Sequence, residues 1–153
     1  MAIDLVSMSE EEYIDFYRFS VREYAKGHIK AGNWSEKEAN ENAAKQFDQL
    51  LPQGLNTKDH KLFTIQQGQN SIGHLWIYVE LNKKQAFIYD VYLKEEARGK
   101  GYGKETMQAL DEYAISNAIE KISLHVFAYN ETAIQLYKSM GYEITDYYMS
   151  KVL

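Results

Sequence analysis

Two segments in the first third of the chain carry apolar residues at helical spacing. The first follows a capping box formed by Ser9 and Glu12, and Gly27 is suited to end it. The second follows a similar box, Ser35 with Glu38, and a proline and a glycine close it. The pattern therefore predicts two helices before most of the strands. Their apolar positions are Ile14, Tyr17, Val21 and Tyr24 in the first helix, and Ala39, Ala43, Phe47 and Leu50 in the second.

Alternating apolar and polar residues then predict a run of strands. Segments 62–66 and 71–80 are joined by a glycine turn, and a second turn at residues 82–84 leads into a strand over residues 86–93. Because these turns are short, the strands should form an antiparallel meander. A weaker alternation over residues 2–7 predicts a short first strand.

Helical and strand patterns alternate in the remainder of the chain. A glycine-rich segment precedes a helix that runs to about Asn117, and residues 122–126 alternate as a strand. Asn130 caps a last helix that ends at Gly141, and the apolar residues from 142 to 153 predict a closing strand or two short ones. Early helices, a meander, and then alternating strands and helices form a mixed α+β order.

Composition narrows the classes of protein that fit this order. With 153 residues, 45% of them hydrophobic, the chain is expected to form one globular domain over residues 1–153. The net charge of −5 argues against a general nucleic-acid binder. No apolar run reaches the length of a membrane span, and residues 1–9 lack the pattern of a signal peptide. We therefore expect a cytoplasmic protein with no membrane or nucleic-acid partner.

Cysteine and histidine usage limits the chemistry further. The chain contains no cysteine, which excludes disulfides, thiolate metal sites and a cysteine acyl-enzyme. Its four histidines show none of the spacings typical of zinc sites on a helix. We therefore expect no metal, and any acyl transfer must use another nucleophile.

A basic, glycine-rich loop follows the strand that ends at Leu93. Its three glycines allow a sharp turn, and the first amides of the following helix offer free N–H groups and a positive dipole end. Such a loop is therefore expected to bind phosphate. Neither the dinucleotide fingerprint nor the P-loop pattern fits its residues. The loop consists of Arg98, Gly99, Lys100, Gly101, Tyr102, Gly103 and Lys104.

Two motifs stand on either side of the helix and strand that follow this loop. The first is R-x-x-G-x-G at Arg98, Gly101 and Gly103. The second, over residues 124–142, has the form L-x-V-x-x-x-N-x-x-A-x-x-L-Y-x-x-x-G-Y. In this order both are similar to motifs of the GNAT family of N-acetyltransferases, in which the first binds the pyrophosphate of acetyl-CoA. The resemblance covers roughly residues 60–150.

The resemblance implies a three-layer α+β fold whose mixed, mostly antiparallel sheet is flanked by helices and opened by a V-shaped split. Acetyl-CoA would lie in this split, within a core formed by residues 86–142. On this analogy the strand end from Val91 to Leu93 bonds the pantetheine arm, and the glycine loop wraps the pyrophosphate. Asn130 would bond the pantetheine or the acetyl end, although a plain helix cap also suits an asparagine.

The implied reaction is direct attack by a neutral amine on the thioester, with both substrates bound together. Tyr137 matches the tyrosine of the family's A-x-x-L-Y, and the resemblance implies that it is the general acid for the departing thiolate. The alternative is that Tyr137, one of 13 tyrosines, only packs on a helix stripe. Backbone N–H groups near residues 91–93 are the expected donors to the oxyanion.

The sequence offers three candidates for the general base. The histone-modifying branch of the family has a glutamate at the position where this chain has Phe87. Asp90 and Glu80 are the nearest carboxylates, and His74 lies on a neighbouring predicted strand. Each of the three can equally be structural, because a water chain can also carry the proton.

Acceptor specificity is expected to reside in the helices of residues 10–55. Glu23, His28 and Trp34 are candidates for that wall, since carboxylates and aromatic rings attract a cation. A small amine or polyamine is favoured by the acidic balance, and a protein or peptide amine stays open. A non-catalytic acyl-CoA-binding module and a non-enzymatic nucleotide-binding domain are the alternatives from other classes.

The closing segment, residues 142–153, also bears on assembly. It contains enough apolar residues to pair with a second subunit, or it can be an internal strand. Of the two states we favour a homodimer.

Overall fold

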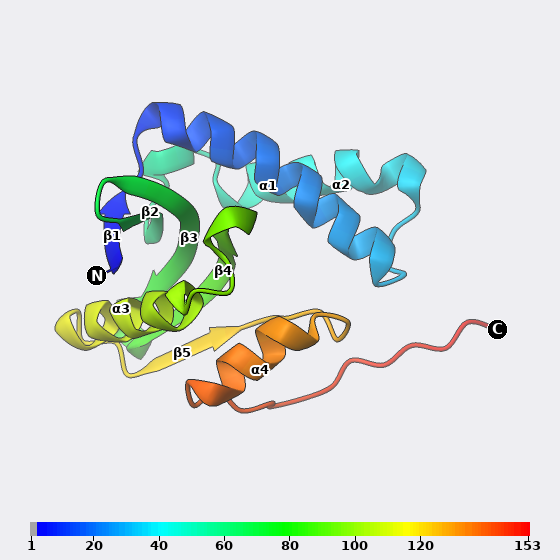
Figure 1. The fold of residues 1–153 in the computed structure, drawn as a ribbon. Helices are drawn as coiled ribbons and strands as arrows, with labels where there is room; N and C mark the ends of the chain where they lie inside the picture. The colour runs from blue at the N-terminus through cyan, green and yellow to red at the C-terminus, as the bar shows by residue number, and fades with distance from the viewer. Residues whose placement is uncertain (1–2) are drawn as a thin grey trace.

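A five-stranded sheet forms the centre of the protein, whose computed structural model describes residues 3–153 (Figure 1). The strand order is β1-β2-β3-β4-β5, with antiparallel pairs from β1 to β4 and a parallel pair between β4 and β5. The predicted meander and the mixed α+β class are therefore confirmed. The strands are β1 (Ile3–Ser7), β2 (His60–Gln67), β3 (Asn70–Glu80), β4 (Gln85–Leu93) and β5 (Lys121–Leu124).

Helices cover both faces of this sheet. Phe16 of α1 and Phe47 of α2 pack with Trp76 on one face, whereas Met107 and Leu110 of α3 join the larger core on the other. The short helix α4 lies beside β5, as Figure 1 shows. The helices are α1 (Glu10–Lys30), α2 (Glu36–Leu50), α3 (Tyr102–Ser116) and α4 (Glu131–Ser139).

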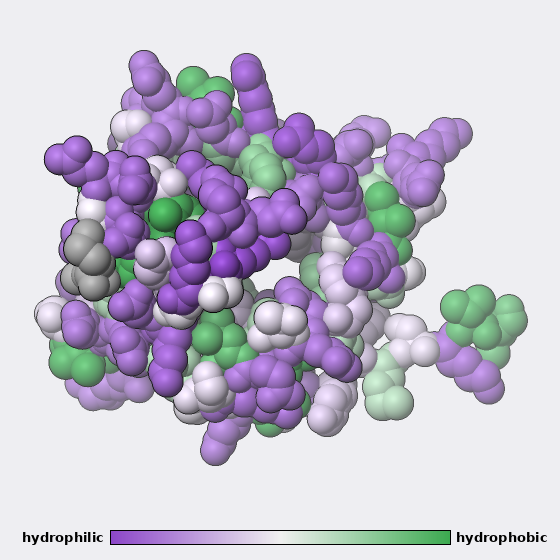
Figure 2. Space-filling model, viewed as in Figure 1, coloured by the Kyte–Doolittle hydropathy of each residue, from purple (hydrophilic) through white to green (hydrophobic). Residues whose placement is uncertain are grey.

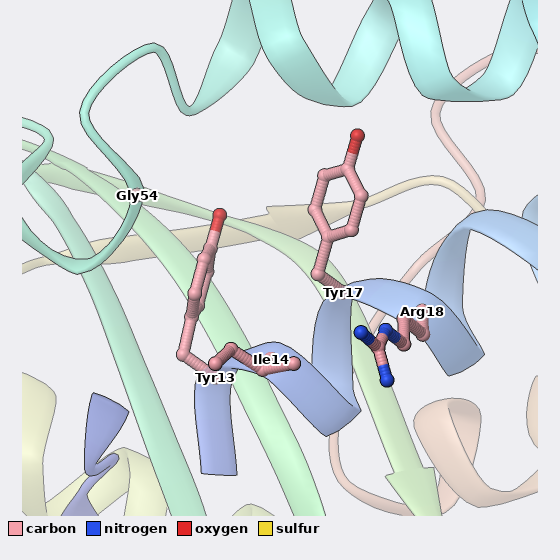
Figure 3. A pocket seen from close by; sticks show the side chains of 5 residues that line it. All are labelled: Tyr13, Ile14, Tyr17, Arg18 and Gly54. Carbon is pink, nitrogen blue, oxygen red and sulfur yellow. The ribbon is translucent and has the colours of Figure 1, made fainter. Parts of the chain in front are cut away.

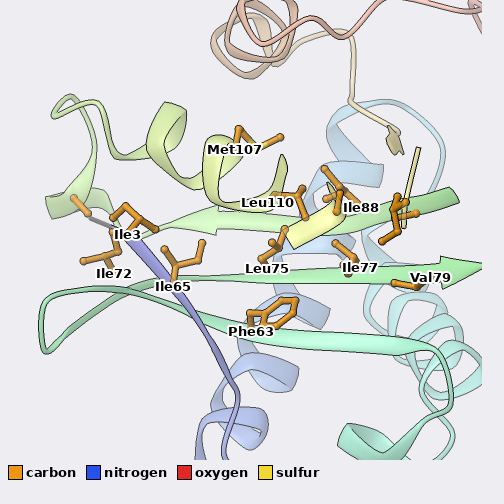
Figure 4. Close-up of a cluster of buried hydrophobic side chains, with 14 residues drawn as sticks. Ile3, Phe63, Ile65, Ile72, Leu75, Ile77, Val79, Ile88, Met107 and Leu110 are labelled. Carbon is orange, nitrogen blue, oxygen red and sulfur yellow. The ribbon is translucent and has the colours of Figure 1, made fainter. Parts of the chain in front are cut away.

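The larger core fills the space between the sheet and α3 (Figure 4). Leu75 and Ile77 of β3 and Ile65 of β2 are fully buried in it. Because side chains alternate along a strand, the intervening residues of β3 reach the opposite face and meet α1. The core consists of Ile3, Phe63, Ile65, Ile72, Leu75, Ile77, Val79, Ala86, Ile88, Ala97, Met107, Leu110, Ala114 and Ile119.

Local capping signals place the start of α1 correctly, but the predicted end is wrong. The Glu12 amide donates to Ser9 Oγ at 3.1 Å, and the Ser9 amide donates to Glu12 Oε1 at 2.9 Å, so the predicted capping box is formed. The helix continues past Gly27 to Lys30. Gly27 is buried, and a Cβ there would lie 2.8 Å from Cε2 of Phe127. This glycine therefore allows close packing and does not end the helix.

Two strand predictions near the end of the chain need correction. The strand predicted over residues 122–126 is observed as Lys121–Leu124, because β4 and β5 separate beyond that point. The closing strand predicted over residues 142–153 does not form within the described chain. These residues have no ladder partner there, and from Glu143 onward they are exposed. A strand pattern alone does not supply the sheet edge that a strand needs.

Gly73 allows β3 and β4 to approach at the place where β4 ends. A Cβ at Gly73 would lie 2.0 Å from the carbonyl oxygen of Tyr92, so the backbone itself blocks any side chain. We expect Gly73→Ala to lower the free energy of unfolding by about 3 kcal/mol, measured by urea denaturation. Gly32→Ala is the matched control: it also adds one methyl group, but into open space in a surface turn with φ +81°. It should cost only about 1 kcal/mol of backbone strain. Equal losses in the two variants would contradict a packing role for Gly73.

Candidate functional site

The sheet opens between β4 and β5. The two strands pair from Gln85 with Lys121 to Ile88 with Leu124, and no further. Beyond Ile88, the edge of β4 that faced β5 has no strand partner among the described residues. Backbone N–H and C=O groups on that edge are therefore available to a ligand. Figure 2 shows the surface hollowed between the main body and the part that holds β5 and α4.

A β-bulge stands at the start of this opening. Trp76 pairs with Asp90 and Ile77 pairs with Ile88, so Tyr89 is the extra residue on β4. A bulge changes which residues face each side of the sheet. Ile88 points into the α3 core, whereas Tyr89 stacks on Trp76 at 4.7 Å and Asp90 also faces α1. The bulge thus directs a carboxylate to the face covered by α1.

Asp90 forms a hydrogen bond with His74 of β3. The distance from His74 Nε2 to Asp90 Oδ2 is 2.7 Å, and their side chains are 10% and 32% exposed. The imidazole is held by aromatic rings: Phe16 meets it edge-on at 4.8 Å, and Tyr92 stacks on it at 5.4 Å. A nearly buried histidine is thus fixed beside a carboxylate that solvent can reach.

Tyr137 approaches the opening from the opposite side. It lies on α4, packed against the larger core, and its ring is 5.8 Å from that of Tyr142. Burial, together with the negative charge of Asp90, raises the pKa of Tyr137 to about 12. The two groups therefore influence one another although β4 and β5 diverge between them. At neutral pH the Tyr137 hydroxyl keeps its proton.

Asn130 is the cap of α4, as its sequence context predicted. Its side-chain oxygen accepts a hydrogen bond from the Ala133 amide at 3.3 Å. The side-chain nitrogen makes no hydrogen bond with residues 3–153, so it stays available at the exposed start of the helix.

The glycine-rich loop connects β4 to α3 in the predicted way. Gly99 and Gly101 have φ values of +74° and +84°, and Gly101 caps the helix without a side chain. The first helical bond is donated by Glu105 to the Gly101 carbonyl at 3.2 Å. The preceding amides of Tyr102, Gly103 and Lys104 consequently remain free for an anion.

The three loop glycines serve different purposes. A Cβ at Gly99 or Gly101 would meet nothing within 4 Å, so these two are required by their backbone angles. At Gly103 a Cβ would lie 3.2 Å from Leu136 Cδ2, so this glycine allows α3 to pack closely on α4. The sequence analysis expected a sharp turn from all three, and Gly103 does not have the positive φ of the other two.

Arg98 is tied to the end of β4. Its Nε donates to the Leu93 carbonyl at 2.9 Å, and its guanidinium lies 5.3 Å from the ring centre of Tyr92. Val91 and Leu93 direct their side chains to the larger core, and both residues lie beyond Ile88, where the pairing of β4 with β5 ends. Lys100, by contrast, lines a surface pocket of about 310 Å3 beside the loop, together with Lys94 and Tyr102.

Glu80 does not lie at the opening. It pairs with Gln85 at the start of β4, where β4 and β5 are still joined, and its carboxylate is 3.4 Å from Lys83 Nζ. Asp90 pairs four residues earlier on β3, at Trp76. At about 3.3 Å per strand residue, the backbone positions of Glu80 and of Trp76, which pairs with Asp90, are separated by roughly 13 Å along β3.

The far half of α1 forms a wall on the α1 side of the opening. His28 stacks on Trp34 at 4.0 Å and meets Phe127 edge-on at 5.2 Å. Lys30 Nζ lies 4.3 Å from the centre of the Tyr129 ring. Glu23 is exposed and pairs with Lys26 at 3.2 Å. The predicted wall residues His28 and Trp34 are thus packed together, and Glu23 points to solvent.

Another pocket, of about 300 Å3, lies outside this site (Figure 3). It is lined by Tyr13, Ile14, Tyr17, Arg18 and Gly54. None of these residues belongs to the opening between β4 and β5. We therefore do not assign the pocket to the site.

Comparison with known families decides between the possible classes. The family model described as "Acetyltransferase (GNAT) family" matches residues 13–142. This is most of the chain, and it includes the loop, Asp90 and Tyr137.

The chain belongs to the GNAT family.

Similar proteins agree with this assignment. YycN of Bacillus subtilis, named an uncharacterized N-acetyltransferase, is 42% identical over 100% of both chains. Its crystal structure superposes with a TM-score of 0.97 and covers 99% of each chain. A thialysine N-epsilon-acetyltransferase of Sus scrofa is 30% identical over 49% of this chain and 46% of its own. A spermidine N-acetyltransferase from Vibrio cholerae, 18% identical, shares the fold with a TM-score of 0.63 over 91% of this chain and 79% of its own.

Family membership makes this protein an acetyl-CoA-dependent N-acetyltransferase with the GNAT fold. Within residues 3–153 there is no group of three or more histidine, cysteine, aspartate or glutamate side chains placed to hold a metal ion. In the same part of the chain, every helix is too short or too polar to cross a membrane.

Several residues of the site escaped the sequence analysis. Phe19 and Tyr92 lie 4.5 Å apart, and both rings meet His74, so they complete the aromatic surroundings of the His74–Asp90 pair. Tyr89 was missed because no local signal marks a bulge in a strand of alternating residues. Gly73 was the available clue, since a glycine inside a strand often marks a close approach of two backbones.

Proposed function

We propose that this enzyme transfers the acetyl group of acetyl-CoA to the primary amine of a small cationic acceptor, such as a polyamine or an amino acid side chain. The amine would attack the thioester directly while both substrates are bound. The observation that carries the proposal is the placement of Asp90 on β4 and of Tyr137 on α4, on the two sides of the opening where β4 and β5 separate; they lie near enough for the Asp90 charge to contribute, after burial, to the raised pKa of Tyr137. An acid and a base for one reaction must face the same substrate from different sides.

The cofactor would lie along the free edge of β4, with its phosphates at the start of α3. Free amides at Tyr102, Gly103 and Lys104 support this position, as do the charges of Lys100 and Lys104. Val91 and Leu93 would bond the pantetheine arm through their backbone groups. The side-chain nitrogen of Asn130 would bond the pantetheine or the acetyl end from the other wall.

Tyr137 would act as the general acid. When the tetrahedral intermediate collapses, the bond between the acetyl carbon and sulfur breaks, and the thiolate accepts the Tyr137 proton or its hydrogen bond. The Tyr137 pKa of about 12 lies above the usual pKa of a thiol, about 8.5, so a hydrogen bond is the cheaper contribution. Burial excludes water from that hydrogen bond, and a hydrogen bond is stronger in a buried site than in water.

Asp90 would receive the amine. Its carboxylate attracts an ammonium group, and the hydrogen bond to His74 offers the departing amine proton a route away from the reacting carbon. Glu80 is not retained in this role, because it lies near the joined ends of β4 and β5.

The chemistry of the surface around Asp90 supports a cationic acceptor. Aromatic rings line this surface, and on the wall formed by the far half of α1 the Lys30 ammonium group already lies over the face of the Tyr129 ring. The net charge of −5 acts in the same direction. Relatives lend support: one is named a thialysine acetyltransferase, and a spermidine acetyltransferase of the same fold was crystallised with CoA and spermine.

The proposal predicts thiol release that depends on one class of amine. We would follow free CoA thiol with acetyl-CoA and a panel of polyamines, amino acids including thialysine, and short basic peptides. Turnover with the small amines is the expected result. Turnover with the peptides alone would replace the small acceptor by a protein amine. CoA binding without any turnover would favour a non-catalytic module.

Tyr137→Phe should separate chemistry from binding in the same assay. Loss of the acid is expected to lower kcat roughly 100-fold, while the Kd for CoA, measured by calorimetry, stays the same. The control is Tyr142→Phe, since the Tyr142 hydroxyl is also buried but has no hydrogen-bond partner in the described chain. It should keep its kcat. An unchanged kcat in Tyr137→Phe would remove the acid role.

Asp90→Asn should impair the use of the amine. We expect kcat/KM for the amine to fall roughly 100-fold, with little change in the KM for acetyl-CoA. The pKa of Tyr137 should also fall, because the negative charge that raises it is gone. The alkaline limb of the kcat profile should therefore move to lower pH. Glu80→Gln, which removes the other carboxylate, is the control and should leave both parameters unchanged. A loss of amine kcat/KM in Glu80→Gln, with none in Asp90→Asn, would assign the base role to Glu80.

Gly101→Ala should weaken the cofactor site through the backbone alone. Alanine disfavours a φ of +84°, so we expect the free loop to relax away from this angle. Returning to it on binding, at a cost of about 1.4 kcal/mol, corresponds to a tenfold increase in the Kd for CoA. Gly141→Ala is matched, since its φ is +94° and its Cβ would also meet nothing within 4 Å. That variant lies outside the loop and should bind CoA normally in calorimetry. Equal Kd values for the two variants would argue against this loop as the phosphate site.

A further inference from the structure

Ser20 is a buried polar residue that has no part in the reaction as proposed so far. It lies on α1 and is only 3% exposed, and its hydroxyl oxygen Oγ forms no hydrogen bond with residues 3–153. A serine inside a helix often bonds the carbonyl group one turn earlier, but this one does not. A buried hydroxyl without a partner is costly, so its position calls for an explanation.

Ser20 shares one side of α1 with the residues four positions before it and seven positions after it. Four positions before, the Phe16 ring meets that of His74 on β3 at 4.8 Å. Seven positions after, Gly27 lies against Phe127, which follows β5. Figure 1 shows α1 crossing the sheet in this direction. Ser20 is about 6 Å further along the helix than Phe16, and neighbouring strands are about 4.8 Å apart, so the serine lies over β4.

The residues around this serine on α1 reach the part of β4 that borders the opening. Phe19 directly precedes the serine, and its ring lies 4.5 Å from that of Tyr92. Tyr24, one turn after the serine, lies near enough to Tyr89 for that group to add to the rise that burial causes in the Tyr24 pKa. The serine is thus bracketed by two side chains that meet β4 at residues 92 and 89.

Asp90 is the charged residue in this part of β4. It faces α1, because its Oδ2 is bonded to His74 at 2.7 Å, and its side chain is 32% exposed. The carboxylate and the Ser20 hydroxyl therefore face the same space, one from β4 and the other from α1. Two oxygen atoms on separate elements suit the two N–H groups of one amine.

We propose, on the basis of the acetyl transfer proposed above, that Ser20 binds the acceptor: its Oγ accepts a hydrogen bond from one N–H of the amine while Asp90 Oδ1 accepts one from the other. A neutral primary amine has two N–H groups and one lone pair. With both N–H groups bonded, the lone pair is left to point into the opening, towards the thioester. No covalent bond to Ser20 forms or breaks.

This arrangement selects primary amines. A neutral secondary amine has a single N–H group, so it leaves either the Ser20 hydroxyl or the Asp90 carboxylate without its bond. A site built to bond both N–H groups rejects an analogue that lacks one of them, because a buried polar group is then unpaired. Ser20 is therefore a residue that determines acceptor specificity.

The first test measures amine binding without turnover. Calorimetry follows 1,4-diaminobutane, the probe for a primary amine, as it binds to the protein saturated with CoA. Ser20→Ala should raise the Kd of the diamine about tenfold, because one hydrogen bond to a charged group is lost. The Kd for CoA should stay the same. The urea midpoint should not fall, since alanine removes a buried hydroxyl that had no partner in its own chain.

Tyr142→Phe is the matched control for this test. It removes the other buried side-chain oxygen that has no hydrogen-bond partner in the described chain, but from a residue outside the space between α1 and β4. This variant should bind the diamine as the parent does. An unchanged Kd in Ser20→Ala, equal increases in the two variants, or a parent protein that does not bind the diamine would overturn the role of Ser20.

The second test measures selectivity during turnover. We would compare kcat/KM for 1,4-diaminobutane with that for its N,N′-dimethyl derivative, in which both amines are secondary. The parent should prefer the primary amine, and Ser20→Ala should reduce this preference about tenfold, mainly by slowing the primary amine. An unchanged preference would overturn the role of Ser20 and leave the proposed acetyl transfer intact. Conversely, diamine binding that depends on Ser20 without any thiol release would support the amine site and contradict the proposed function.

Discussion

The short pairing of β4 with β5 is the constraint on which the rest of the structure depends. Four residues of each strand are joined, and then the strands diverge. In the joined part, the sheet and α3 bury a continuous apolar core. In the open part, backbone groups of β4 lack strand partners and must be satisfied by water or a ligand. A substrate that lies between the strands can thus be bonded as a missing strand would be, without any specialised side chain.

The bulge at Tyr89 gives this opening its chemistry. Without it, the alternation of β4 would place residue 90 with Ile88, towards α3 and away from α1. With it, Asp90 reaches His74 in a setting of aromatic rings, where a hydrogen bond between polar groups is favoured by the low dielectric. The same carboxylate raises the pKa of Tyr137 on the far wall. One extra residue in a strand therefore connects the two walls of the site electrostatically.

Sequence analysis predicted features whose causes are local. The capping box at Ser9, the cap at Asn130 and the left-handed glycines of the loop each depend on residues within a few positions of one another. It failed where distant contacts decide. The sequence predicts a helix end at Gly27, but the residue there must be glycine because the ring of Phe127, a hundred residues away, packs against it. Likewise Asp90 and Glu80 were equivalent in sequence, and only strand register separates them.

The closing segment shows the same limit in its sharpest form. Its residues have the composition of a strand, yet strand structure needs a partner edge, and propensity cannot say on which molecule that edge lies. Its first residue is informative, because the ring of Tyr142 lies 5.8 Å from that of Tyr137. Any force that holds the segment would therefore also hold the end of α4 and the ring beside the site.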